Sequence, residues 1–137
     1  MAATVLHGED GLRSAVDAHL GYSDWLEVDA ARIALFAQAT GDIDATYLSI
    51  SLSNMFLPQI VEVRGFSMGI NYGTETVRFP TPLVAGTALR GGASLEELTE
   101  VRGGVQTRML ITIESRDAEG LAGKPVCIIE SISRWLH

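Results

Sequence analysis

The sequence predicts an α+β fold in which a curved antiparallel sheet wraps around a central buried helix. Two observations carry this prediction. The first is an apolar stretch, residues 42–60, which reads DIDATYLSISLSNMFLPQI and has no charged residue between Asp44 and Glu62. The second is a series of alternating segments over residues 61–136. A helix that is apolar on nearly all sides is usually buried, so we expect the strands to surround it.

Composition and charge limit the possible classes of protein. We interpret residues 1–137 as a single domain with a loose N-terminal end over residues 1–10. Hydrophobic residues make up 47% and charged residues 20% of the chain, which argues against disorder. A net charge of −7 argues against a nucleic-acid partner, because phosphate binding needs a basic surface. No signal-peptide pattern or spanning segment is present, so we expect a cytoplasmic protein with no membrane partner.

Neither a disulfide nor a metal site is indicated. Cys127 is the single cysteine, and it lies in the apolar run KPVCIIESI, so we interpret it as a core residue. The three histidines are far apart in the sequence, and no zinc-binding or phosphate-loop motif is present. We therefore predict no metal site.

Two short elements are expected near the N-terminus. Residues 11–19, GLRSAVDAH, indicate a short helix. Residues 23–28 alternate between polar and apolar side chains, which is typical of a short strand and would carry Trp25 inward.

Two longer helices follow. Asp29 is placed to cap a helix over residues 30–40, and Gly41 is placed to end it. The apolar stripe of this helix is expected at Ile33, Phe36 and Ala37. The central helix then extends from about residue 45, with Asp42 and Asp44 as N-cap candidates and Pro58 at its exit.

The second half of the chain predicts strands joined by hairpin-type links, as an antiparallel meander. Glycine and proline residues mark the breaks between them. The expected strands cover residues 61–63, 66–79, 87–98, 104–115 and 125–136.

Several of these stretches resemble the MaoC-like hydratases of the hotdog fold, the group of (R)-specific 2-enoyl-CoA hydratases. The resemblance covers roughly residues 20–137 and rests on residues 23–42, 47–52, 70–90 and 124–135. It implies a hotdog fold, a homodimer paired through its sheets, and an acyl-CoA or other acyl thioester as substrate. The implied reaction is the hydration of a trans-2-enoyl thioester, a lyase reaction of fatty acid metabolism that uses no cofactor.

The resemblance also implies where the site lies. In the family, an Asp and a His hold the water, and backbone N–H groups at the start of the central helix hold the thioester oxygen. Asp42 matches the family Asp and is the candidate catalytic residue for water activation. The candidate substrate-binding residues are those at the helix start, Asp44, Ala45, Thr46 and Tyr47.

The chain departs from the family pattern at one place. Asp42 is followed directly by Ile43, where the family would have about 15–20 further residues that include the catalytic His. Ala45 stands where the family has a second His, and Thr46 where it has a Gly. Three explanations remain open: an engineered scaffold from which a loop was removed, a mobile loop absent from the sequence, or a natural relative that is not a hydratase. The alternative function is therefore a non-catalytic hotdog scaffold that binds a hydrophobic or acyl-thioester ligand.

Overall fold

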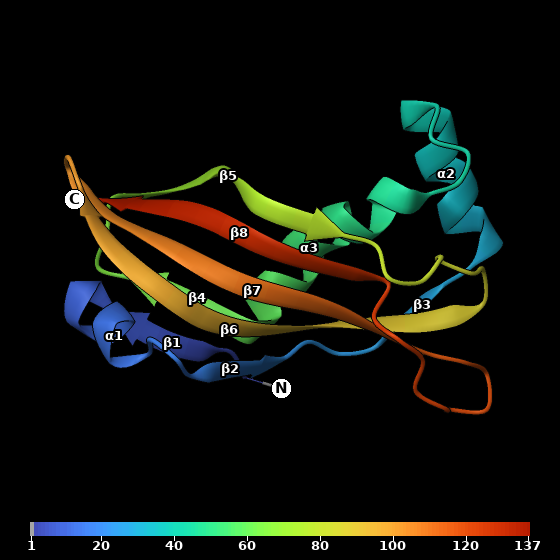
Figure 1. Ribbon diagram of the computed structural model, residues 1–137, viewed down its shortest axis with the longest axis horizontal. Helices are drawn as coiled ribbons and strands as arrows, with labels where there is room; N and C mark the ends of the chain where they lie inside the picture. The colour runs from blue at the N-terminus through green and yellow to red at the C-terminus, as the bar shows by residue number, and fades with distance from the viewer. Residues whose placement is uncertain (1) are drawn as a thin grey trace.

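A long antiparallel sheet lies along a single central helix in the computed structural model, which describes residues 2–137 (Figure 1). The sheet has the strand order β2-β6-β7-β8-β5, and β3 also pairs with β6. The elements are β1 (Thr4–His7), α1 (Gly8–Ser14), β2 (His19–Tyr22), β3 (Leu26–Val28), α2 (Ala30–Thr40), α3 (Thr46–Ile60), β4 (Val61–Arg64), β5 (Met68–Arg78), β6 (Thr87–Val101), β7 (Gly104–Arg116) and β8 (Cys127–Leu136). None of the described helices is long and apolar enough to cross a membrane.

The alternating pattern of β7 corresponds directly to its burial. This strand lies between β6 and β8, so both of its edges are hydrogen-bonded. Its inward side chains are fully or nearly fully buried, whereas those between them are partly exposed. The inward residues are Val105, Thr107, Met109, Ile111 and Ile113.

The strand order corrects the predicted meander. β5 pairs with β8, from Met68 beside Leu136 to Arg78 beside Ile128, and does not pair with β6. The segment between β5 and β6 therefore crosses from one edge region of the sheet to the other. An alternating pattern identifies a strand but carries no information about its neighbours, so the sequence could not give this order.

The central helix α3 packs one side against the sheet. Leu48, Leu52, Phe56 and Ile60 recur at four-residue spacing, and each is at most 6% exposed. Gly91 on β6 makes room for this contact, because an added Cβ there would lie 2.9 Å from the Phe56 Cβ.

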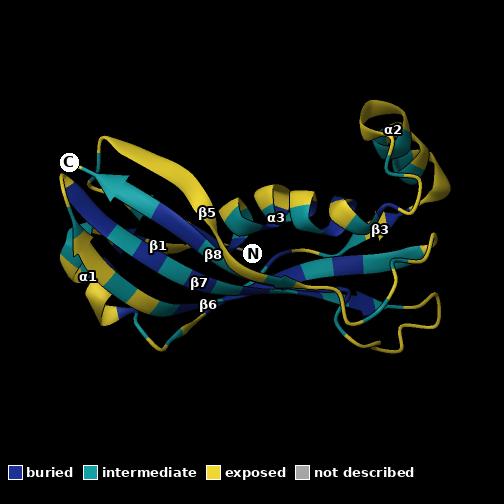
Figure 2. Ribbon diagram, turned by 45° about the horizontal axis from the view of Figure 1, so that its top comes forward, coloured by how far each residue is buried: buried dark blue, intermediate teal, exposed yellow. Residues whose placement is uncertain are grey.

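The opposite side of α3 remains exposed, as Figure 2 shows. Tyr47 is 61% and Met55 43% exposed. The expectation that the helix is enclosed on all sides is therefore wrong for a single chain, because the sheet covers only one side of it. Pro58 lies within α3 and does not end it.

The first residues are not a loose end. β1 pairs in parallel with β4, starting with Thr4 beside Val61, and α1 follows directly. Leu12 of α1 is fully buried, and Leu6 of β1 is 9% exposed. These two leucines attach the segment to the core. α1 begins and ends earlier than the expected helix over residues 11–19, and part of that range belongs to β2.

Trp25 lies on the outer side of the sheet, which corrects the expectation that it points inward. Two guanidinium groups pack on its ring, with the ring centroid 4.8 Å from the Cζ of Arg90 and 4.3 Å from the Cζ of Arg116. Both arginines alternate with buried residues along their strands and therefore point outward. Stacking with arginine stabilises a tryptophan that stays half-exposed.

Candidate functional site

The link between α2 and α3 is short and continuous. α2 has the predicted bounds, with the Arg32 N–H donating to Asp29 Oδ1 at 2.8 Å, and it ends at Gly41 with a φ of 78°. The Ala45 N–H then donates to the Asp42 carbonyl oxygen at 3.3 Å, and α3 begins at the next residue. Ala45 has a φ of 55°, a left-handed conformation that costs an alanine about 1 kcal/mol.

Asp42 holds the start of α3. Its Oδ2 accepts a hydrogen bond from the Tyr47 N–H at 3.0 Å. The first N–H groups of a helix have no partner within the helix, so this contact caps α3. Asp44, the other expected cap, is exposed, and among the described residues it forms no hydrogen bond to the helix.

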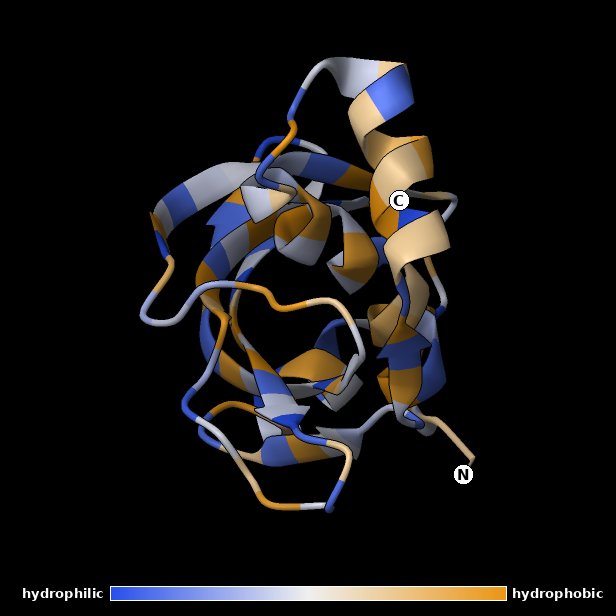
Figure 3. Ribbon diagram, turned by 90° about the vertical axis from the view of Figure 1, so that its right-hand side faces the viewer, coloured by the Kyte–Doolittle hydropathy of each residue, from blue (hydrophilic) through white to orange (hydrophobic). Residues whose placement is uncertain are grey.

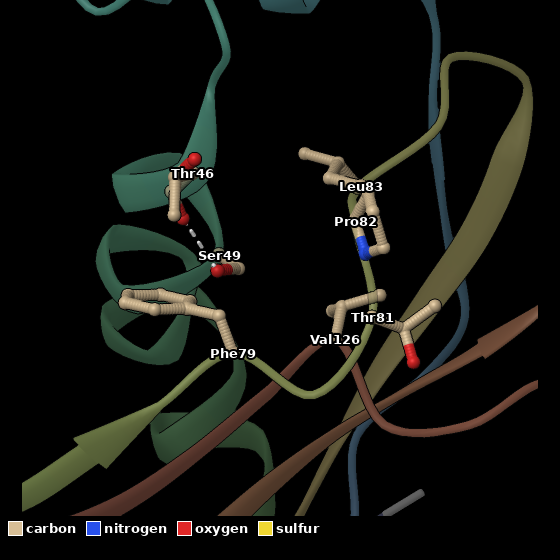
Figure 4. Close-up of a pocket in the computed structure, with 7 residues that line it drawn as sticks. All are labelled: Thr46, Ser49, Phe79, Thr81, Pro82, Leu83 and Val126. Carbon is tan, nitrogen blue, oxygen red and sulfur yellow. Dashed lines mark hydrogen bonds between the residues drawn. The ribbon is translucent and has the colours of Figure 1, made fainter.

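A cavity of about 240 Å³ lies beside the first turns of α3 (Figure 4). It separates this helix from the segment after β5 and from the residue before β8. The Ser49 Oγ–H donates to the Thr46 carbonyl oxygen at 2.7 Å within the cavity wall. The wall combines hydroxyl groups with apolar surface and has no titratable side chain. Its residues are Thr46, Ser49, Phe79, Thr81, Pro82, Leu83 and Val126.

The structure brings only part of the predicted site to this cavity. Thr46 lines it, and Tyr47 lies near its rim, where its ring stacks on Phe79 with 5.8 Å between ring centroids. Asp42, Asp44 and Ala45 lie before the helix and do not line it.

Sequence reasoning missed the wall opposite α3. The Phe-Pro-x-Pro turn over residues 79–82, one of the stretches that carries the resemblance, was the available signal for it. Ser49 and Val126 had no such signal, because they lie within ordinary helix and strand patterns.

No histidine lines the cavity. His19 packs against Tyr22 in a tilted ring pair, and His137 stacks on Phe66, both away from the start of α3. Over the described residues, no group of three His, Cys, Asp or Glu side chains could hold a metal ion.

The Cys127 thiol lies behind the cavity wall and is fully buried, as predicted for a core residue. Burial raises the pKa of this thiol, and a hydrogen bond with the Ser49 side chain partly offsets that rise. A buried thiol with a raised pKa is a poor nucleophile, so the structure gives Cys127 a packing role.

The sequence is similar to curated proteins across most of its length. It is 32% identical to 3-hydroxyacyl-thioester dehydratase Z of Mycobacterium tuberculosis, over 91% of this chain and 93% of that protein. It is 31% identical to nodulation protein N of Rhizobium leguminosarum, over 85% of this chain and 88% of that protein. No protein-family model matches the chain.

Solved structures share the fold at low sequence identity. The monoamine oxidase regulatory protein of Archaeoglobus has a TM-score of 0.63 and 12% identity, covering 99% of this chain and 97% of its own. The MaoC-like dehydratase of Rhodospirillum rubrum has a TM-score of 0.53 and 16% identity, covering 90% and 93%. The (R)-hydratase of A. caviae has a TM-score of 0.53 and 14% identity, covering 84% and 94%.

The match to the mycobacterial dehydratase also contains gaps in this chain. It spans 145 aligned positions, but 91% of 137 residues is about 125, so about 20 positions have no residue of this chain. Fold and sequence together place this chain in the MaoC-like family of hotdog dehydratases and (R)-hydratases.

Proposed function

We propose that this chain binds an enoyl or 3-hydroxyacyl thioester, as an acyl-CoA or another carrier thioester, and interconverts the two forms. The observation that carries the proposal is the cavity at the start of α3 in a chain 32% identical to a 3-hydroxyacyl-thioester dehydratase. The cavity has apolar side chains for an acyl group and lies next to helix N–H groups suited to a thioester oxygen.

The proposed reaction needs one base and one proton donor. In hydration, the oxygen of water bonds to the β-carbon of the enoyl thioester, and the base takes the proton that water loses. The electron pair of the double bond moves to the α-carbon through the thioester enolate, and the α-carbon then takes up a proton. Asp42 is the candidate for both steps because, although it lies before α3 and outside the cavity wall, it is the carboxylate that contacts the helix start beside the cavity.

Crotonyl-CoA hydration by the purified protein tests this role. We expect slow turnover that Asp42→Asn lowers by about 100-fold, the usual worth of a general base. The asparagine carbonyl can still accept the Tyr47 N–H, so the helix cap survives. Asp10→Asn on α1 is the matched control and should keep full turnover. Turnover that is indifferent to Asp42→Asn would remove this residue from the mechanism.

A second candidate function is binding without turnover. Two observations favour it: the cavity wall has no titratable side chain, and the Asp42 carboxylate already accepts the Tyr47 N–H. Calorimetric titration with crotonyl-CoA separates the two candidates. Binding that Val126→Trp abolishes, with no hydration by the wild type, would support this function and reject catalysis.

We further propose a homodimer formed through the free edge of β5. This strand has 11 residues and, among the strands of the described residues 2–137, pairs only with β8. If two copies of β5 pair antiparallel around Gly73, Glu75 faces the partner's Asn71 and Arg78 faces the partner's Met68. No like charges then face each other across the pair.

Charge changes at one position test this pairing. Asn71→Glu would place a carboxylate opposite Glu75 in both symmetric contacts, whereas Asn71→Lys would place an ammonium group there. We expect sedimentation equilibrium to show weaker dimers for Asn71→Glu and intact dimers for Asn71→Lys. Equal behaviour of the two variants would contradict the β5 pairing.

A further inference from the structure

The outward side of α2 is poorer in polar residues than an ordinary surface helix, since Ala31, Ala34, Leu35 and Ala39 are exposed beside Gln38 and Thr40. Ile33 and Phe36 pack against the core, but no residue of α2 is buried. Leu35 is 67% exposed on the other side, and Arg32 is the only charged residue among AARIALFAQAT. A helix at a water interface normally presents polar side chains there, so this side is suited to contact with another protein surface.

The exposed apolar side chains continue beyond α2 toward α3. Ile43 in the link is 80% exposed, and Tyr47 at the start of α3 is 61% exposed. We call Leu35, Ile43 and Tyr47 the α2 corner. Figures 1 and 2 both show α2 standing clear of the sheet, so a second molecule can reach its outward side.

The charges near the α2 corner favour a second copy of this chain as the partner. Two copies with a net charge of −7 repel each other, so they can meet only where their surfaces are neutral or complementary. Arg32 and Asp44 are one cation and one anion, and neither forms an ion pair with any other described residue. α3 contributes no charge at all.

Antiparallel packing of two α2 helices would use these residues together. Leu35 is the middle residue of Ala30–Thr40, so a crossing there brings the two Leu35 side chains into contact. The first turn of one helix then lies beside the end of the other, which brings Arg32 near the partner's Asp44. The Leu35 contact lies on the two-fold axis and occurs once, whereas the contact between Arg32 and the partner's Asp44 occurs twice.

We propose that α2 is a docking surface for a second copy of this chain, with Leu35 packed against the partner's Leu35 and Arg32 paired with the partner's Asp44. This contact goes beyond the proposed function and does not depend on catalysis. It is also separate from the β5 pairing, since the middle of β5 and α2 lie apart in Figure 1. If both contacts form about perpendicular two-fold axes that intersect, the assembly closes with four chains.

Charge reversal tests the polar contact. Arg32→Glu alone and Asp44→Arg alone each place like charges in both symmetric contacts, and we expect either to halve the number of chains per assembly in native mass spectrometry. The dissociation constant of this contact should rise about tenfold or more. Mixing the two variants places opposite charges in every contact between unlike chains, so the full assembly should return.

Mixing the Arg32→Glu and Asp44→Arg variants shows whether residues 32 and 44 pair between two chains or within one chain. If Arg32 and Asp44 pair only within one chain, mixing the single variants restores nothing, and the proposal fails. If the β5 pairing is wrong but the α2 contact is right, the single variants are monomers rather than dimers. A wild type that is monomeric at all concentrations overturns both contacts.

A matched leucine pair tests the apolar contact. Leu35→Asp should reduce the assembly in the same way, whereas Leu121→Asp, at a leucine of almost equal exposure in the β7–β8 turn, should leave it intact. Circular dichroism of both variants checks that each is folded. An assembly that survives Leu35→Asp, or that Leu121→Asp disrupts equally, would overturn the docking surface.

Discussion

β7 and β5 are both long strands that alternation predicts, yet they differ in almost every other respect. β7 has 13 residues, with inward side chains that are buried and outward ones that are half-buried. β5 has 11 residues, and all of them are exposed except Val77, which is half-buried. β7 has a strand on each side, whereas β5 has only β8 beside it in the part of the chain that the structure describes.

The difference shows that an extended backbone and a buried strand are separate properties, although an alternating sequence is often taken to predict both. A run of β-branched and alternating residues favours an extended backbone, and this held for both strands. Burial of a strand also requires a paired strand along each edge and a packed layer of side chains across one face. Within a single chain, β5 has a paired strand along one edge and, over the described residues, no layer that buries either face. The exposure of β5 is therefore the physical basis for proposing that a second copy pairs with its edge.

The largest expected effect on stability comes from truncating an isoleucine on β7, and the same truncation on β5 serves as its comparison. Ile113 on β7 is fully buried, and Ile70 on β5 is 36% exposed. Ile113→Ala should lower the free energy of unfolding by about 2–5 kcal/mol, through lost burial and an unfilled cavity. Ile70→Ala should lower it by about 0.5 kcal/mol, as at most surface positions. Urea denaturation measures both values, and equal losses would contradict the contrast.

Two glycine substitutions test whether β5 packs tightly against the neighbouring strand β8. A Cβ at Gly69 would lie 2.6 Å from the Cζ3 of Trp135, whose Nε1–H donates to Thr107 Oγ1 at 3.0 Å. Gly69→Ala should therefore displace this ring and cost about 1–3 kcal/mol. At Gly73 nothing lies within 4 Å of an added Cβ. Gly73→Ala should stay within about 0.5 kcal/mol of the wild type.

Thermal unfolding and tryptophan fluorescence measure this second pair. The fluorescence of Gly69→Ala should change with the position of the Trp135 ring, whereas that of Gly73→Ala should match the wild type. A Gly69→Ala protein with wild-type stability and fluorescence would show that β5 is not held at this end.

The smallest expected effect is a dependence of folding stability on pH, which arises from the buried Cys127 on β8, the strand beside β7. Cys127 pairs with Ile113, and burial holds the pKa of its thiol above the ordinary value of 9.0. Above pH 9 the unfolded thiol ionises while the folded one keeps its proton, so stability is complete below that pH and falls as pH rises. In the Cys127→Ala variant, the free energy of unfolding should decrease less steeply as the pH rises above 9. A wild type and a Cys127→Ala variant with the same slope would contradict a buried thiol.

Part of the candidate site could be read from the sequence. The position of α2, its Asp29 cap and its Gly41 end were predictable because they depend on local backbone chemistry. The relation of Asp42 to the start of α3 was also predictable, since a carboxylate before a helix commonly binds its first N–H groups. The cavity wall beyond α3 was not, because it joins residues that are 30 to 80 positions apart.

By itself the sequence determined the class of the fold, the bounds of its later strands to within about three residues and the family of the chain. These depend on side-chain periodicity, on caps and on residue identities, which are all local properties. Only the tertiary structure decided that β5 pairs with β8, that α3 buries one side, that Trp25 faces outward and that the first residues join β4. Each of these depends on which surfaces meet, and the free energy of that choice comes from contacts between residues distant in the chain.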